Sequence, residues 1–114
     1  MTSRTSVINI DNGRFDDWQR ALGRTLTEQI RDALKTVALT PEQRKELTAD
    51  IGFRVAAILD GSGGVFKGEE EAQVVVMFSE VASPDNLTAC EGESWMHEYA
   101  QGWVEDMPIT DFEG

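Results

Sequence analysis

The segment TPEQRKELTADIGFRVAAILDG, residues 40–61, decides how this chain folds, because its second half fits either a helix or a strand. It opens at Thr40 with a capping-box pattern and a proline at the first helical position. Residues 51–59 alternate like a strand, yet their apolar side chains also line one face of a continuing helix. Gly61 suits the left-handed residue that ends a helix. We therefore predict one helix to about Leu59, with a strand over residues 51–59 as the alternative.

A longer helix is predicted before this segment, over residues 15–37. At about 100° per residue, its apolar side chains fall within one arc. That arc contains Phe15, Trp18, Leu22, Leu26, Ile30, Ala33, Leu34 and Val37. Ahead of the helix, residues 5–10 suit a short strand and residues 11–13 suit a turn. We therefore expect residues 1–13 to form an extended N-terminal arm or strand.

The opposite side of this predicted helix carries four cations, which we call the basic stripe. They are Arg20, Arg24, Arg31 and Lys35. Glu28 lies among them, at the spacing that allows it to pair with Arg24 or Arg31. Two interpretations are open. The stripe is either a solvated, partly self-paired helix face, or it docks onto an acidic surface of the C-terminal half, within one chain or across a dimer.

The second half of the chain is predicted to supply the sheet and a last helix. Residues 72–79 contain a run of consecutive apolar residues and predict the clearest buried strand, and residues 87–90 predict a further short one. Apolar residues over 95–107 recur at the three-and-four spacing of one helix face. Residues 108–114 are expected to form a short acidic tail that is either disordered or clipped onto the core, with Phe112 as its one large anchor.

Together these elements predict one small acidic globular domain over residues 1–114. We expect the α+β class, with two N-terminal helices and one C-terminal helix packed on a small antiparallel sheet centred on residues 72–79. A mostly helical bundle with a β-hairpin is the alternative fold. With 114 residues and 40% hydrophobic content, the chain is long enough for one core and too short for two.

The negative charge belongs almost entirely to the second half of the chain. The formal net charge is −11, and after Arg54 thirteen acidic residues accompany a single basic one, Lys67. A field of this sign repels nucleic acid and membranes and attracts basic protein surfaces. Cys90 is the only cysteine, so no intrachain disulfide forms, and no apolar run has the length of a membrane span. We expect a cytoplasmic protein whose partner is a basic protein surface or a second copy of itself, without nucleic-acid or membrane binding.

Two segments approach metal-binding motifs without completing them. His97 begins the sequence HEYAQ, which departs from the H-E-x-x-H helix of zinc metalloproteases at Gln101, and the chain has no second histidine. Residues 60–71 have the acidic ends of an EF-hand calcium loop, but Val65 occupies the position that needs glycine. The thiolate of Cys90 is disfavoured by its acidic neighbours. We therefore assign no metal, no cofactor and no catalytic residue.

We recognise no known family in these residues, so the functional expectation rests on charge. It is a non-enzymatic, soluble binding or regulatory protein whose acidic C-terminal half contacts a basic protein partner or dimerises. The surface assigned to a partner or ligand comprises His97, Glu98, Gln101 and Glu105. The alternative is a small-ligand or divalent-metal-dependent enzyme centred on His97 and nearby carboxylates, and enzymatic activity is the less favoured class.

Overall fold

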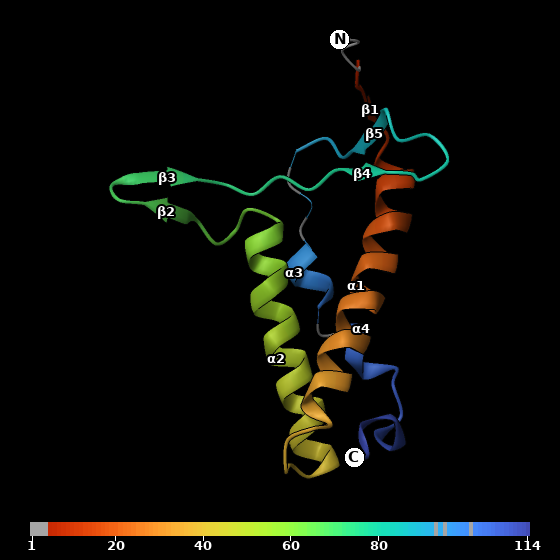
Figure 1. Ribbon diagram of the computed structural model, residues 1–114, viewed down its shortest axis with the longest axis vertical. Helices are drawn as coiled ribbons and strands as arrows, with labels where there is room; N and C mark the ends of the chain where they lie inside the picture. The colour runs from red at the N-terminus through yellow and green to blue at the C-terminus, as the bar shows by residue number, and fades with distance from the viewer. Residues whose placement is uncertain (1–4, 93, 95, 101) are drawn as a thin grey trace.

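The structure, a computed structural model, describes residues 5–92, 94, 96–100 and 102–114. Its body consists of two long helices that lie side by side, with the C-terminal helical segment packed beside them (Figure 1). The first helix, α1 (Asn12–Leu34), begins where the Asp11 carboxylate accepts a hydrogen bond from the Arg14 N–H at 3.0 Å. Such a cap satisfies one of the backbone donors left free at a helix start.

The second helix, α2 (Pro41–Leu59), begins with the predicted capping box. The Thr40 hydroxyl accepts from the Gln43 N–H at 3.1 Å, and the Gln43 side chain accepts from the Thr40 N–H at 3.0 Å. After the helix, Gly61 has a φ of 83°, in the left-handed region that favours glycine. The helix predicted to about Leu59 is therefore confirmed, and the strand alternative over residues 51–59 is wrong.

The buried faces of the two helices consist largely of small or polar residues spaced four apart. On α1 the buried residues are Phe15, Gln19, Gly23 and Thr27, and on α2 they are Arg44, Thr48, Gly52 and Ala56. Rows of residues four apart are the ridges that interlock when helices pack. The hydroxyls of Thr27 and Thr48 donate to carbonyl oxygens of their own helices, at 2.8 and 2.7 Å, so they need no partner across the interface.

A three-stranded sheet lies at the N-terminal end of α1, in the order β1-β5-β4 (Figure 1). β1 (Val7–Ile10) runs parallel to β5 (Asn86–Ala89), while β4 (Phe78–Ser79) runs antiparallel to it. A second sheet is the hairpin of β2 (Val65–Lys67) and β3 (Glu70–Ala72), which projects from the body and buries none of its residues. This shape gives a radius of gyration of 16.6 Å, against about 13 Å for a compact chain of this length.

The α+β class with two N-terminal helices is confirmed, but the single strand predicted over residues 72–79 is wrong. Residues 73–77 belong to no strand, and only the two ends of the predicted segment pair, in β3 and β4. Val75 within it is 73% exposed. Strand propensity depends on packing against neighbouring strands, and here the run crosses from the hairpin to the sheet without pairing with any strand of the described residues. The central strand of the sheet is β5.

The C-terminal helical segment comprises α3 (Met96–Tyr99) and α4 (Gly102–Glu105), and the tail continues as the 3₁₀ helix η1 (Ile109–Phe112). Met96, Ala100 and Val104 are buried, and η1 packs on α2. Trp95 and Gln101, both part of the predicted last helix, lie outside the described residues. Within the described ranges, none of the helices combines the length and apolarity needed to cross a membrane.

Gly23 and Gly52 allow a matched test of this packing. A Cβ at Gly23 would lie 2.1 Å from Cε2 of Trp103, whereas a Cβ at Gly52 has nothing within 4 Å. Each Gly→Ala change gains about 1 kcal/mol of helix propensity, but displacing the indole costs about 1–3 kcal/mol. We expect Gly23→Ala to lower the free energy of unfolding by up to about 2 kcal/mol, and Gly52→Ala to raise it by up to about 1 kcal/mol. Urea denaturation measures both, and equal stabilisation by the two changes would contradict the packing of Trp103 on α1.

Candidate functional site

His97 belongs to a polar cluster at the C-terminal end of α2, together with Asp60 and Ser62. The buried Asp60 carboxylate accepts hydrogen bonds from the His97 backbone N–H at 2.8 Å and from the Ser62 backbone N–H at 2.9 Å. Its Oδ2 atom also contacts Nδ1 of His97, and the Ser62 hydroxyl lies 3.1 Å from the same nitrogen. The ring of Phe53 meets the imidazole edge-on, with 5.9 Å between ring centroids. These contacts fix the start of α3 against the end of α2.

This grouping of serine, histidine and aspartate lacks the geometry of a nucleophilic triad. In a triad the carboxylate holds Nδ1, while the nucleophile faces Nε2 on the other side of the ring. Here Ser62 and Asp60 share Nδ1. The imidazole therefore cannot take a proton from Ser62 on one side while Asp60 orients it from the other. The arrangement supports a structural role for His97.

Asp60 gives this cluster a dependence on pH. Burial alone raises the pKa of Asp60. Hydrogen bonds from the backbone and the side chain of both His97 and Ser62 outweigh this effect, so the pKa of Asp60 is lowered. A carboxyl that is more acidic in the folded state contributes stability above its unfolded pKa of about 3.9. That contribution is lost as the pH falls through the lower, folded pKa.

We expect Asp60→Asn to lower the free energy of unfolding at pH 7 by about 1–3 kcal/mol, because the amide leaves buried donors poorly paired. The difference from the unsubstituted chain is expected to shrink at acid pH, where Asp60 itself becomes protonated. Urea denaturation at pH 7 and below pH 4 measures both effects. Asp50→Asn is the control, because the Asp50 carboxylate forms an exposed pair with Arg54 at 3.2 Å, worth about 0.5 kcal/mol. Equal effects of the two changes at pH 7 would contradict the role of Asp60.

A cavity of about 100 Å³ lies beside this cluster, between the end of α2, residues 73–76 and the end of β5. Ligand pockets commonly have volumes of about 300–1,000 Å³, so this cavity is too small for a typical organic ligand. Cys90 lines it, and burial raises the pKa of the Cys90 thiol. A raised pKa disfavours the nucleophilic thiolate. Across the part of the chain that the structure describes, no three His, Cys, Asp or Glu side chains are grouped to hold a metal ion.

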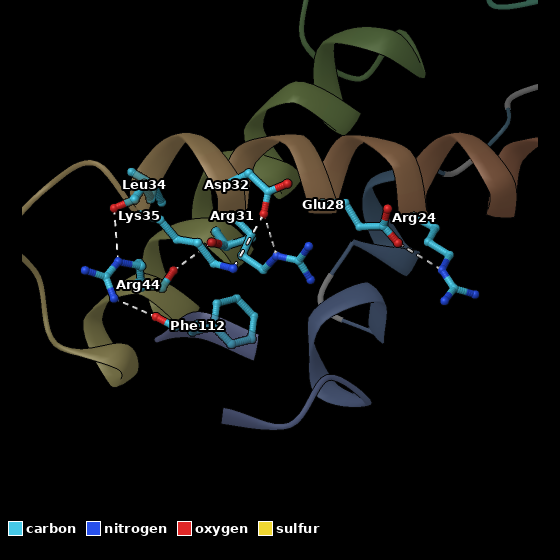
Figure 2. Close-up of polar contacts among 9 residues, drawn as sticks. Arg24, Glu28, Arg31, Asp32, Leu34, Lys35, Arg44 and Phe112 are labelled. Atoms are coloured by element: carbon cyan, nitrogen blue, oxygen red, sulfur yellow. Dashed lines mark hydrogen bonds and ion pairs between the residues drawn. The ribbon is translucent and has the colours of Figure 1, made fainter. Parts of the chain in front are cut away.

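The cations of the basic stripe are paired with acidic residues of α1. Arg24 pairs with Glu28 at 3.1 Å, and Arg31 and Lys35 pair with Asp32 at 3.0 and 3.8 Å (Figure 2). Arg20 pairs with Asp16 at 3.0 Å. This pairing corresponds to the self-paired interpretation of the stripe.

The C-terminal acids nevertheless approach the stripe within the same chain. Arg24 and Arg31 line a hollow of about 480 Å³ together with Asp106 and Asp111. Among the residues described, no ion pair crosses this hollow directly. The hollow therefore brings opposite charges together across solvent, where their attraction is weak.

Acidic side chains gather on another side of α2, along a groove whose larger part lies between α2 and the C-terminal segment. We call it the α2–α4 groove. It consists of a hollow of about 520 Å³ between α2 and the C-terminal segment and an adjoining hollow of about 340 Å³ that α2 residues alone line, and the two share Glu46 and Ala49. Its acidic residues are Glu42, Glu46 and Asp50 of α2 and Glu105 of α4, and its apolar residues are Ala49, Phe53, Val104 and Ile109.

Among the described residues that line this groove, the cation is Lys45, and it is already engaged. The Lys45 ammonium donates to the Met107 carbonyl at 3.0 Å and lies 5.9 Å from the centroid of the Phe112 ring. Asp50 pairs with Arg54. Glu42, Glu46 and Glu105 have no cationic partner among the residues that the structure describes. The groove is therefore an apolar surface flanked by uncompensated negative charge.

Comparison of the chain with protein families, curated proteins and solved structures finds no match. Its function is therefore inferred from this geometry alone.

The structure separates the residues of the predicted partner surface. Glu105 lines the groove and Glu98 is exposed, whereas His97 is tied to Asp60, and Gln101 lies outside the described residues. Sequence reasoning missed Glu42 and Glu46, because the first half of the chain is nearly neutral as a whole. The available signal was the row of acids at positions 42, 46 and 50, which the four-residue helix spacing places on one face of α2.

Proposed function

We propose that this chain is a non-enzymatic binding protein that holds a basic segment of another protein in the α2–α4 groove. The observation that carries this proposal is a set of three carboxylates, Glu42, Glu46 and Glu105, which lie beside apolar side chains and form no ion pair among the described residues. Lys45, the cation beside them, is bound to the Met107 carbonyl. Like charges so close together repel one another, and a cationic partner removes that repulsion. The net charge of −11 adds long-range attraction for the same partner.

Other functional classes fit the geometry less well. Two copies that met through this groove would bring uncompensated carboxylates together, which disfavours dimerisation at this surface. Nucleic acid requires a basic footprint, and the cations of the basic stripe are paired with acids of α1. An enzyme centred on His97 is the less favoured alternative, because Ser62 and Asp60 share one imidazole nitrogen. We also propose a cytoplasmic location, because the free thiol of Cys90 stays reduced in that compartment.

Affinity isolation from the host at low and high salt tests the proposal, with two matched triple variants. The groove variant neutralises the groove with Glu42→Gln, Glu46→Gln and Glu105→Gln. The hairpin variant removes the same charge from the β2–β3 hairpin with Glu69→Gln, Glu70→Gln and Glu71→Gln. We expect a partner that binds the unsubstituted chain and the hairpin variant at low salt, and that dissociates at high salt. Its affinity for the groove variant is expected to fall at least about tenfold. Equal binding to both variants would contradict the proposal.

A further inference from the structure

We infer that the segment held in the α2–α4 groove is an amphipathic helix with lysine or arginine on both sides of its apolar stripe. This inference rests on the proposed function and specifies the partner. It follows from the arrangement of side chains on α2, from the nature of the groove walls and from the position of the carboxylates.

The side chains of α2 that face the groove repeat at helical spacing. Successive residues of a helix are rotated by about 100°. On α2 the side chains that face the groove therefore share one arc, itself about 100° wide, which contains Ala49, Glu42, Phe53, Glu46 and Asp50. Glu42, Glu46 and Asp50 form one row with steps of about 6 Å along the helix axis, and Ala49 and Phe53 form the row beside it. A partner helix has the same four-residue repeat, so its cations and apolar side chains match both rows over several turns.

The groove walls favour a helix over an extended segment. They are built from helices, so they offer no strand edge with which an extended backbone could pair. The N–H and C=O groups of an extended segment would lie against Ala49, Val104 and Ile109 without partners, which is costly. A helix satisfies its own backbone groups. The exposed edge strand β1 lies elsewhere, beside the start of α1.

The dimensions of the groove suit about three helical turns. Glu42 and Phe53 are eleven positions apart on α2, which corresponds to about 16 Å. The small side chain of Ala49 lies between them and allows a second helix to approach at the usual axial separation of about 8–10 Å. Phe53 is 42% exposed and Ile109 is 40% exposed, so each has apolar surface that the partner would cover.

The carboxylates lie on both sides of the apolar residues. Glu42 and Glu46 belong to α2, while Glu105 belongs to α4, together with buried Val104. A helix with cations on one flank alone would leave the other side uncompensated. The partner is therefore expected to carry lysine or arginine on both flanks of a leucine-rich stripe.

Binding of two synthetic peptides tests this inference. The first is a peptide of about 16 residues made of leucine, lysine and alanine, with leucines at the three-and-four spacing and lysines on both flanks. The second has the same composition in an order that forms no apolar face. We expect the first to bind and become helical, as measured by titration calorimetry and circular dichroism. The second is expected to bind at least about tenfold more weakly.

Charge-reversal variants locate the binding. Glu46→Lys with Glu105→Lys changes one carboxylate on each side of the groove, and Glu69→Lys with Glu70→Lys changes the net charge equally on the hairpin. We expect the groove pair to weaken the amphipathic peptide at least about tenfold and the hairpin pair to weaken it less than about threefold. Far-ultraviolet circular dichroism checks that both variants are folded.

The outcomes distinguish this inference from the proposed function. If the groove variant loses both peptides equally, the groove binds basic segments but does not select a helix, and the inference is wrong. If the groove and hairpin variants weaken the peptide equally, binding follows net charge alone, and the groove is not the binding surface. Absence of any binding by the amphipathic peptide also overturns the inference.

Discussion

Replacement of Arg44 with methionine is expected to lower the free energy of unfolding by about 3 kcal/mol or more. Arg44 is 4% exposed, and its guanidinium donates to the carbonyls of Leu34 at 3.0 Å, Val37 at 3.0 Å and Phe112 at 2.6 Å. It therefore joins the end of α1, the loop to α2 and the C-terminal η1, and Figure 2 shows its contacts with Leu34 and Phe112. Methionine fills similar space but donates nothing, so three hydrogen bonds from a charged donor are lost, each worth about 1 kcal/mol or more. The carbonyls of Leu34 and Val37 keep the backbone N–H groups of Val37 and Leu39 as donors, whereas the Phe112 carbonyl loses the Arg44 guanidinium that donates to it.

A short series of substitutions separates this hydrogen bonding from packing. Arg44→Lys keeps the charge but replaces the planar guanidinium with a single ammonium, so we expect an intermediate loss. Arg54→Met is the control on the same helix, because the Arg54 side chain is largely exposed, and its effect is expected to stay within about 0.5 kcal/mol. Urea denaturation followed by tryptophan fluorescence measures all three. Equal stability of Arg44→Met and Arg54→Met would show that Arg44 does not hold the three segments together.

Signals that act over a few residues predicted the helical pair. Thr40 and Gln43 are close enough in the chain to form the capping box by themselves, and Gly61 adopts the conformation that glycine alone reaches easily. These signals extended α2 through residues 51–59, where the apolar pattern alone was ambiguous. Local chemistry therefore resolved what periodicity left open.

The features that the sequence pattern did not predict depend on contacts between segments far apart in the chain. The arc predicted for α1 included Trp18 but not Gly23, yet Gly23 is buried because Trp103 of α4 packs directly against it. In the same way, residues 73–77 have strong strand propensity, but they pair with no strand in the part of the chain that the structure describes. Parallel pairing of β1 with β5 joins segments about 80 residues apart, and no local pattern reports it.

The two candidate sites were predictable to different degrees. The cluster joins His97 to Ser62 and Asp60, which lie 35 and 37 positions earlier in the chain. Only tertiary packing reveals that Ser62 and Asp60 share one nitrogen of His97. The acidic row on α2 was visible in the sequence, because helical spacing alone places Glu42 and Glu46 on one face. The opposite side of the groove was not visible in the sequence, because its position depends on where the C-terminal segment packs.

Phe112→Ala is expected to lower the free energy of unfolding by about 3–5 kcal/mol, although Phe112 is the third residue from the end of the given chain. Its side chain is 0% exposed, its ring lies beneath the Lys45 ammonium, and its carbonyl accepts from Arg44. Truncation removes the apolar contacts of a large buried ring and leaves a cavity against α2. Phe66→Ala is the matched control, because Phe66 on the hairpin is 67% exposed. A loss no larger than that of the control would show that η1 is not packed on α2.

The same substitution links stability to the proposed binding. Arg44 holds η1 through the Phe112 carbonyl, and the buried Phe112 ring holds the same residue through apolar contacts. Since both contacts fix one segment, the double variant Arg44→Met with Phe112→Ala is expected to lose less stability than the two single losses added together. Ile109 of η1 lines the α2–α4 groove, so a loosened η1 removes part of the apolar surface on which the amphipathic peptide would lie. At a temperature where the variant is still folded, we therefore expect Phe112→Ala to weaken that peptide and Phe66→Ala to leave its affinity unchanged. Unchanged affinity in both variants would place the bound helix on α2 and α4 alone, away from η1.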